Sequence, residues 1–406
     1  MNIMKNQNET SKPTPPKQKH RAFKIWIPTL GLLLLALFLI FWDNQSISQK
    51  EPLIPTPIAK SLNPLEALLY SQLPELVSSA GHSGWVLDEL EFNADNTQAL
   101  LWMAESDLQD DDIVAREPDI VLALWQAEGQ SWQLHQPSDE DFAQIFLNSD
   151  FKDSEFAQRI FPDADPKAGP SGPTYGGYKL PWRAGQTKRI TWSVAHSSCN
   201  PQSYCTYAYD FADGTMFDVV AAKGGFVYHW KDSCANGNSK CTNSFTLEDR
   251  TTTPWTYQIY LHFAQNSIPA ALKQEGVYVQ QGQFIGKADD TGVSTGHHLH
   301  FMVVEQSTLD KCSFYCFGKA VDVTFTDVKI NFDPKTQGGR PRLESEARWY
   351  GGQGQREYTS SNVLAGASLP APTLPPSVTA VPEPTAEPPA ELANKFYLFP
   401  IFKNSR

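Results

Sequence analysis

Hydrophobic positions after residue 60 repeat first with a helical and then with a strand-like period. Leucines spaced three and four residues apart place one apolar face on a predicted helix over Pro64–Leu76. Asp139–Phe151 has similar helical spacing. Between these two segments lie the strand-like runs Gly84–Phe92, Gln98–Ala104, Ile120–Gln126 and Ser131–His135. Residues 61–165 are therefore predicted to form a small α+β domain.

The pattern changes to a mainly β one over residues 178–350. Short runs rich in Val, Ile, Tyr, Phe and Thr alternate with glycine-containing turns, which predicts an antiparallel β-sandwich. Examples of these runs are Val219–Ala222, Gly225–Tyr228, Asn243–Leu247 and Tyr257–Phe263. A Pro/Gly linker is predicted over 166–177. A Pro/Ala/Thr-rich tail is predicted over 351–406, and it ends in an apolar segment of undetermined role.

The N-terminal 60 residues have the pattern of a membrane anchor. Residues 1–24 contain six Lys or Arg and one Glu, which predicts a disordered basic leader. The 18 uncharged residues Ile25–Trp42 are just long enough to cross a bilayer, and a Pro-containing stalk over 43–60 follows. We expect a single span with the leader in the cytoplasm and the remainder outside. The alternative is a cleaved signal peptide and a secreted protein, but no small-x-small cleavage site follows the apolar run.

Six cysteines lie beyond this segment and fall into three close pairs, Cys199/Cys205, Cys234/Cys241 and Cys312/Cys316. None has the Cys-x-x-Cys spacing of a zinc knuckle or a thioredoxin-like site. An even number in local pairs, outside the cytoplasm, favours three small disulfides. Six cysteines allow about 15 pairings, so the spacing alone leaves the connectivity open.

Charge excludes nucleic acid as a partner. The chain has a net charge of −12 and its basic leader +5, so the rest carries −17 and would be repelled by phosphate backbones. Residues 85–165 contribute 20 Asp or Glu against three Lys or Arg. We interpret this excess as a solvated acidic surface. A spacer, an inhibitory module or a site for basic partners or calcium are alternatives, although no Asp-x-Asp-x-Asp-Gly calcium loop is present.

Histidines with metal-ligand character lie in the β region. His298 and His300 alternate with apolar residues and would share one face of a strand. His196 follows a strand-like run, and Asp210 ends an aromatic run in which an uncompensated carboxylate would be costly. Two His and one carboxylate form a reasonable ligand set for a catalytic zinc, which also needs one open position for water. His262 and His298 would remain to move protons.

A resemblance to a known family adds to these residues. Gly276–Phe301, which closes with Ser-Thr-Gly-x-His-Leu-His-Phe, resembles the signature of the lysostaphin-type zinc metallopeptidases. Upstream, Tyr209-Asp210-Phe211, Gly224-Gly225-x-Val227 and Tyr260-Leu261-His262 resemble other family motifs in the same order. The similarity covers roughly residues 178–305. It implies the fold called the duplicated hybrid motif, one zinc per chain and cleavage of peptide bonds in bacterial peptidoglycan.

The resemblance also implies roles for individual residues. Asp210 and His300 would bind zinc, and His262 and His298 would be the catalytic histidines. The family pattern His-x-x-x-Asp is broken, because Thr206 stands four residues before Asp210.

We therefore assign His196 as the remaining ligand, across an inserted loop that contains Cys199/Cys205, with His229 as the alternative. His297 replaces a common proline of the family. It is expected to be an exposed turn residue, or otherwise an additional proton carrier.

The sequence thus predicts a membrane-anchored, extracytoplasmic zinc metalloendopeptidase that acts on peptidoglycan. Two alternatives stay open. The domain could be a catalytically silent binding module that activates another wall hydrolase, or an extracellular peptidase that acts on proteins. Carbohydrate binding by the part after Phe301 is a weaker possibility.

Overall fold

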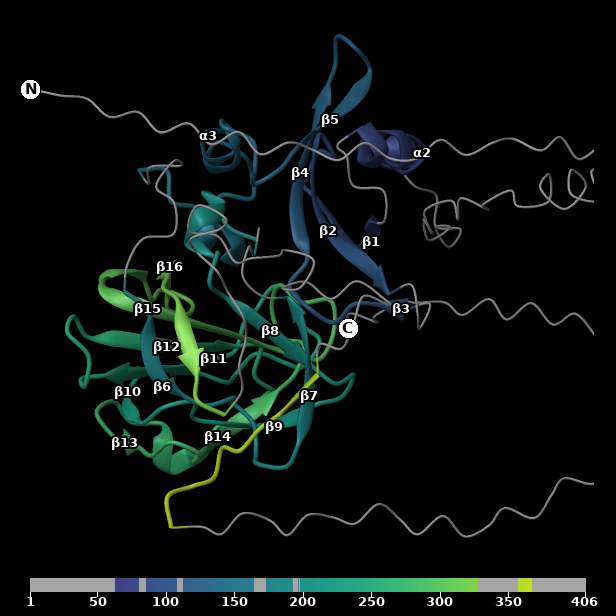
Figure 1. The fold of residues 1–406 in the computed structure, drawn as a ribbon. Coiled ribbons are helices and arrows are strands. Elements are labelled where there is room, and N and C mark those ends of the chain that lie inside the picture. The colour runs from purple at the N-terminus through teal and green to yellow at the C-terminus, as the bar shows by residue number, and fades with distance from the viewer. Residues whose placement is uncertain are drawn as a thin grey trace, which may run out of the picture. The chain divides into compact units, whose positions relative to one another are not determined.

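In the computed structural model, the first part of the chain that is described contains a five-stranded antiparallel sheet (Figure 1). The structure describes residues 63–79, 85–107, 112–163, 173–192, 196, 198–327 and 357–366. The predicted leader, membrane span, stalk and most of the tail lie outside these residues. Within the described ranges, none of the helices combines the length and apolar character needed to cross a membrane.

We call residues 63–163 the acidic module. Its sheet has the strand order β1-β2-β4-β5, with the short β3 paired to β2. The predicted elements are largely present, since each apolar run forms one strand or helix. They are α2 (Pro64–Ser79), β1 (Trp85–Phe92), β2 (Gln98–Asp107), β3 (Asp112–Ile113), β4 (Asp119–Gln126), β5 (Ser131–His135), α3 (Phe142–Leu147) and the 3₁₀ helix η1 (Glu155–Arg159).

The second predicted helix is shorter than expected. The pattern predicted a helix over Asp139–Phe151, but α3 ends at Leu147. Asn148 and Ser149 bind backbone carbonyls of the preceding turn through their side chains, at 2.8 and 2.7 Å. Side chains of this kind compete with the helical hydrogen-bond ladder and favour turns.

The sheet of the acidic module is apolar on both faces. Leu101 and Met103 of β2 pack with α2 on one face, whereas Leu100 and Trp102 point to the other, because successive side chains of a strand alternate. The second face is covered by phenylalanines of α3 and η1. Val293, from the loop that precedes β15, belongs to this second core. The acidic module therefore packs directly on a loop of the β-rich part.

The remaining described residues are mainly β, as predicted. A nine-stranded antiparallel sheet has the order β13-β10-β11-β12-β15-β8-β7-β18, with β16 also paired to β15. Two small sheets, β9 with β14 and β6 with β17, share its hydrophobic core. The strands are β6 (Tyr175–Tyr178), β7 (Thr187–Trp192), β8 (Tyr209–Ala212), β9 (Phe217–Val220), β10 (Gly225–Lys231), β11 (Ser244–Asp249), β12 (Thr256–Leu261), β13 (Tyr278–Val279), β14 (Phe284–Ala288), β15 (His298–Lys311), β16 (Phe317–Ala320), β17 (Val323–Phe325) and β18 (Glu357–Thr359), with 3₁₀ helices η2 (Gln202–Tyr204) and η3 (Ala270–Leu272).

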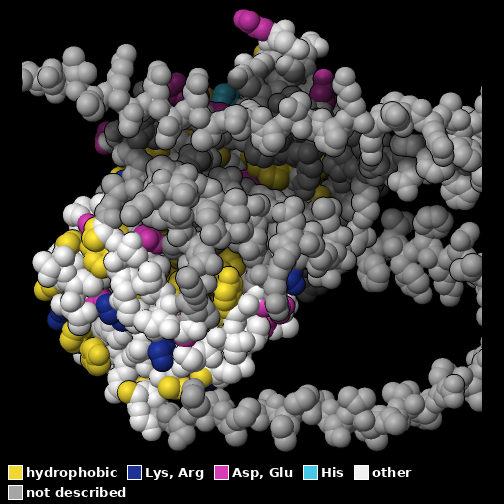
Figure 2. Space-filling view, viewed as in Figure 1, with side chains coloured by type: hydrophobic (Ala, Val, Ile, Leu, Met, Phe, Trp, Pro, Cys, Tyr) yellow, Lys and Arg dark blue, Asp and Glu magenta, His cyan; other side chains and the backbone are white. Residues whose placement is uncertain are grey.

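Neighbouring strands of the large sheet fix the positions of the polar residues singled out above. β15 lies between β12 and β8, so His300 is opposite Leu261 on one side and Asp210 on the other (Figure 1). Leu299 and Phe301 enter the hydrophobic core, as the alternating pattern predicted. On the face of the β-rich part seen in Figure 2, Lys and Arg side chains are scattered rather than gathered in one basic patch.

All three predicted cysteine pairs are disulfides: Cys199–Cys205, Cys234–Cys241 and Cys312–Cys316. Each closes a loop of a few residues, so none ties distant elements together. The first closes the loop between β7 and β8, which leads from His196 to Asp210. The local spacing had left the connectivity open, and the structure settles it as nearest-neighbour pairing.

Gly292 provides a test of the packing between two loops. Its φ is +80°, and a Cβ there would lie 1.9 Å from Thr242 Oγ1. Gly214 has the same φ, but a Cβ there would meet nothing within 4 Å. We expect Gly214→Ala to lower the free energy of unfolding by about 1–2 kcal/mol through backbone strain alone. Gly292→Ala should cost about 1–3 kcal/mol more through overpacking. Urea unfolding of both variants measures the difference, and equal losses would show that the loop can relax.

Candidate metal centre

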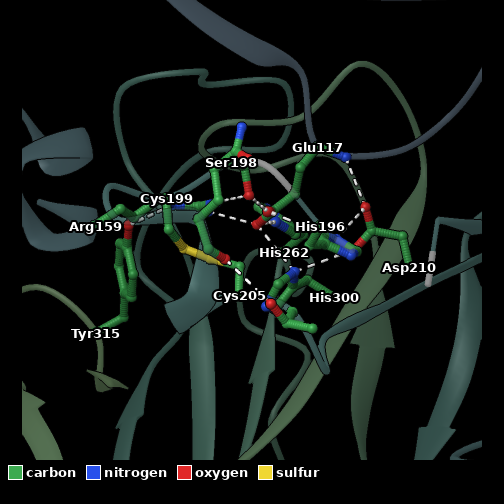
Figure 3. The surroundings of a disulfide bond; sticks show 12 residues. Glu117, Arg159, His196, Ser198, Cys199, Cys205, Asp210, His262, His300 and Tyr315 are labelled. Atoms are coloured by element: carbon green, nitrogen blue, oxygen red, sulfur yellow. Dashed lines mark hydrogen bonds and ion pairs between the residues drawn. A yellow bond between two sulfur atoms is a disulfide. The ribbon is translucent and has the colours of Figure 1, made fainter. Parts of the chain in front are cut away.

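Strand register brings the first two predicted ligands together. Asp210 of β8 and His300 of β15 are direct partners across the sheet, and both are fully buried. His300 Nδ1 lies 3.1 Å from Asp210 Oδ1. Figure 3 shows these two side chains pointing into one cluster from adjacent strands.

His196 joins this cluster from the segment after β7. Its Nε2 atom lies 3.2 Å from Asp210 Oδ2, and its ring stacks on Trp192 with 4.4 Å between ring centroids. The ring of His300 meets it edge-on at 5.3 Å. The separation of 14 positions in the sequence therefore does not keep the two side chains apart. The structure brings His196 beside Asp210 and His300, the two other predicted ligands.

A fourth side chain, Glu117 of the acidic module, enters the same cluster. Glu117 follows β3 and is fully buried. Its Oε1 lies 3.1 Å from His300 Nδ1, and its Oε2 lies 3.9 Å from His196 Nε2. The interpretation of the acidic residues as a solvated surface is wrong for Glu117. The sequence contains no local signal for it, because it is one carboxylate among 20 and lies far from the β-domain motifs.

Donor geometry fits a tetrahedral cation. Glu117, His196, Asp210 and His300 each offer one ligand atom, and these atoms all lie within 4.8 Å of one another. Ligand atoms about 2.1 Å from a tetrahedral zinc lie about 3.4 Å apart. The distances between neighbouring donor atoms of the cluster, 3.1 to 3.9 Å, bracket that separation. Two imidazoles and two carboxylates are also chemically suitable for zinc.

The charges of the cluster favour a cation. Burial alone would raise the pKa values of Asp210 and Glu117. Neighbouring His196 and His298 instead hold the pKa of Asp210 well below its usual range. Arg159 and His300 do the same for the pKa of Glu117. Burial would lower the pKa of His300, but the Glu117 and Asp210 carboxylates raise it to about 9. A divalent cation would replace that proton, since a ligating imidazole must be neutral.

The two predicted catalytic histidines lie beside the cluster. The rings of His262 and His298 are 4.4 Å apart, and both residues are fully buried. His262 Nδ1 lies 2.6 Å from the carbonyl of Thr291, and His298 Nδ1 lies 2.9 Å from that of Gly296. A carbonyl only accepts, so the proton of each ring is on Nδ1 and the lone pair is on Nε2.

The Nε2 atoms of these rings face the cluster. His262 Nε2 is 3.4 Å from Glu117 Oε1, and His298 Nε2 is 3.9 Å from Asp210 Oδ1. Burial and the adjacent His262 lower the pKa of His298 to about 3. His298 is therefore a neutral imidazole with its accepting nitrogen directed at the candidate metal centre, as a proton carrier requires.

The alternatives for these roles lie elsewhere. His229 is on β10 and belongs to neither group of potential ligands in the described residues. His297 is partly exposed, and its Nδ1 lies 2.6 Å from the buried Asp289 Oδ1. With Asp290 this pair forms a second group of possible ligands, outside the four-residue cluster.

Comparison with known proteins assigns part of the chain to a family. Residues 205–311 match the model of Peptidase family M23. That segment includes Asp210, His262, His298 and His300, whereas His196 and Glu117 lie outside it. No curated protein matches the chain.

Several solved structures are similar to the chain. One is the catalytic domain of the antimicrobial peptidase lysostaphin from Staphylococcus simulans, with 24% identity, covering 35% of this chain and 84% of that one, and a TM-score of 0.21. A zinc-containing peptidase from Vibrio cholerae has 14% identity, covering 61% of this chain and 62% of that one, with a TM-score of 0.22. Csd3 of Helicobacter pylori has 13% identity, covering 66% and 57%, with a TM-score of 0.25. The chain thus spans less than two thirds of the last two.

The segment over residues 205–311 is thus similar to Peptidase family M23. The resemblance stated from the sequence motifs is therefore confirmed for this segment. The acidic module and the described residues before 205 lie outside the family match, so their contribution to the site comes from the structure alone.

The position of His196 predicts the metal content of two variants. We expect His196→Ala to lose at least half of the bound zinc after dialysis, because one of the nitrogen donors is removed. His229→Ala should keep the zinc content of the native chain. Metal analysis of the purified full-length chain in detergent measures both. Zinc retained in the first variant and lost in the second would overturn the assignment of His196.

Proposed function

We propose that this chain is a membrane-anchored, extracytoplasmic zinc metalloendopeptidase that hydrolyses peptide bonds in peptidoglycan. We also propose that its β-rich part has the duplicated hybrid motif fold. The observation that carries the proposal is the convergence of His196, Asp210 and His300, with two further imidazoles directly beside them. The M23 match over residues 205–311 supports the reaction class.

His196, Asp210 and His300 would hold one zinc ion. When bound, zinc supplies a Lewis acid that polarises the scissile carbonyl and lowers the pKa of water. The protein supplies the preorganisation. Each ligand comes from a strand or from a segment next to one, and Asp210 also accepts a hydrogen bond of 2.9 Å from the backbone N–H of Glu117.

His262 and His298 would handle the protons. Both rings present Nε2 toward the site and are fixed through Nδ1 by carbonyls, so neither needs to reorient before it accepts a proton. Protonation at Nε2 would let either ring stabilise the oxyanion or pass the proton to the leaving amine. Asp289 links the two, because its backbone N–H donates to the His262 carbonyl and its carbonyl accepts from the His298 N–H, at 2.7 and 3.1 Å.

Membrane attachment is part of the proposal. The uncharged segment Ile25–Trp42 and the basic leader before it support a single span with the peptidase domain outside. The three disulfides favour an oxidising compartment. A cell-wall substrate would lie on that side of the membrane.

One observation favours a second candidate function. Glu117 lies within reach of the remaining ligand position, which a catalytic zinc site keeps for water and substrate. A permanently four-coordinate site would be a structural one. The protein would then be a catalytically silent module that binds or activates another wall hydrolase.

The His298→Ala variant tests the enzymatic proposal. We expect this variant to keep one zinc per chain and to lose cleavage of purified peptidoglycan by at least about 100-fold, the lower range for loss of a proton carrier. Because Glu117 lies where substrate would bind, the comparison is made in the native chain and in a Glu117→Ala chain. Release of soluble peptides and zinc content are measured together.

His229→Ala serves as the matched control and should cleave at the rate of its parent. A chelator should abolish cleavage, and added zinc should restore it. Bound zinc with no cleavage in any form would favour the silent module. Cleavage of glycine-rich peptides but not of peptidoglycan would indicate a peptidase that acts on proteins.

A further inference from the structure

A second group of possible metal ligands lies in the loop that joins β14 to β15. Asp289, Asp290 and His297 each offer one ligand atom, and these atoms all lie within 4.8 Å of one another. Asp289 and Asp290 directly follow β14, whereas His297 directly precedes β15. The group therefore brings the two ends of one loop together. It shares no residue with the candidate metal centre.

The Asp289 carboxylate is a buried group that no hydrogen bond compensates. The residue is fully buried, and neither of its side-chain oxygens accepts a hydrogen bond from any described residue. His297 Nδ1 lies 2.6 Å from Oδ1, but this contact does not have the direction of a hydrogen bond. Burying a carboxylate is costly unless it is paired and hydrogen-bonded or binds a metal ion. The surroundings of Asp289 therefore favour a bound cation.

Other buried aspartates of the β-rich part are compensated in a different way. Asp249 pairs with Lys223 at 2.7 Å, and Asp232 pairs with Lys273 at 2.7 Å. Each of these two carboxylates also accepts a hydrogen bond from a backbone N–H. In the part of the chain that the structure describes, Asp289 pairs with an imidazole and with no lysine or arginine. Its environment is thus that of a metal ligand rather than that of an ordinary ion pair.

Asp290 and His297 add two donors that are nearer to solvent. Asp290 is 8% exposed, and its Oδ1 accepts a hydrogen bond of 2.8 Å from the Gly237 N–H, which fixes the side chain. The side chain of His297 is 40% exposed. Water can therefore reach the group and complete the coordination of an ion. Because calcium and magnesium prefer oxygen ligands alone, the imidazole favours zinc among the common divalent cations.

We propose that Asp289, Asp290 and His297 bind a second zinc ion that fastens the β14–β15 loop. The ligands are separate from those of the candidate metal centre. Since one of the three is partly exposed, the second zinc should bind more weakly than the buried one and should leave during dialysis. His297, which stands where the lysostaphin-type family commonly has proline, is thereby assigned a specific role as a ligand.

The loop that the ion would fasten carries backbone contacts of both predicted catalytic histidines. The Asp289 N–H donates to the His262 carbonyl at 2.7 Å, and the Asp289 carbonyl accepts from the His298 N–H at 3.1 Å. In the same loop, the Thr291 carbonyl lies 2.6 Å from His262 Nδ1. A metal clip across a loop removes conformational freedom from the unfolded chain. The second zinc should therefore stabilise the folded arrangement of this loop.

Zinc titration of the dialysed protein tests the second site. The full-length chain in detergent is dialysed to remove weakly bound metal and is then titrated with zinc sulfate by calorimetry. We expect one further equivalent of zinc in the native chain and in the surface control Glu128→Gln. His297→Ala should bind this equivalent at least about tenfold more weakly, because loss of a ligand weakens binding at least as much as loss of a residue behind one. His297→Pro, which introduces the common family residue, should behave like His297→Ala.

Asp290→Asn provides a conservative variant with a second measurement. The amide oxygen can still accept from the Gly237 N–H, but it is a weaker zinc ligand than a carboxylate. After dialysis, added zinc should raise the Tm of the native chain by at least about 2 °C. It should leave the Tm of Asp290→Asn and of His297→Ala unchanged. Calcium at the same concentration should raise none of these values.

The outcomes separate this site from the candidate metal centre. Zinc that survives dialysis, without a further equivalent on titration, would overturn the second site and leave the metal centre standing. No zinc after dialysis, with an equivalent that His297→Ala loses, would reject the metal centre and support the second site. A further equivalent that all three variants at positions 290 and 297 retain would show adventitious binding elsewhere and overturn the proposal. An equal rise of Tm with calcium would contradict the assignment to zinc.

Discussion

The structure depends on how buried charges are compensated in one small cluster. Two carboxylates, Asp210 and Glu117, lie among imidazoles with no exposure to solvent. Removing such charges from water costs several kcal/mol each unless opposite charges and hydrogen bonds replace the hydration. The Arg159 guanidinium balances the charge of Glu117. Protonated imidazoles, or a cation that replaces their protons, balance the charge of Asp210. The strands, the disulfide-closed loop and the acidic module all meet at this cluster.

The same arrangement explains why the side chains of the site are held in fixed positions. Strand register fixes Asp210 against His300, and carbonyl groups fix the tautomers of His262 and His298. Preorganised groups of this kind need no reorientation during a reaction. The pocket that accepts Glu117 is preorganised in the same way.

The composition of the acidic module does not show where its carboxylates lie. Its sheet is apolar on both faces, and one face buries Val293 from the loop before His298. Some of the carboxylates outside that core form ion pairs with lysines of the β-rich part. The net charge of the sequence does not distinguish exposed carboxylates from paired or buried ones. The structure separates the carboxylate of Glu117, which enters the cluster, from those that pair with lysines of the β-rich part.

Local features could be predicted from the sequence, and long-range pairings could not. Alternation around His298 and His300 and the leucine spacing of the first helix depend on neighbours within a few residues, so periodicity was sufficient to predict them. The cysteine spacing favoured local pairs, but the structure was needed to settle the connectivity. The shorter second helix shows the limit of such patterns, because side-chain hydrogen bonds ended it early. Tertiary structure alone brought Glu117 to His300, 183 positions apart in number, because packing between two sheets leaves no period in the chain. It also selected His196 rather than His229 as the neighbour of Asp210, since strand register, not sequence distance, decides which side chains meet.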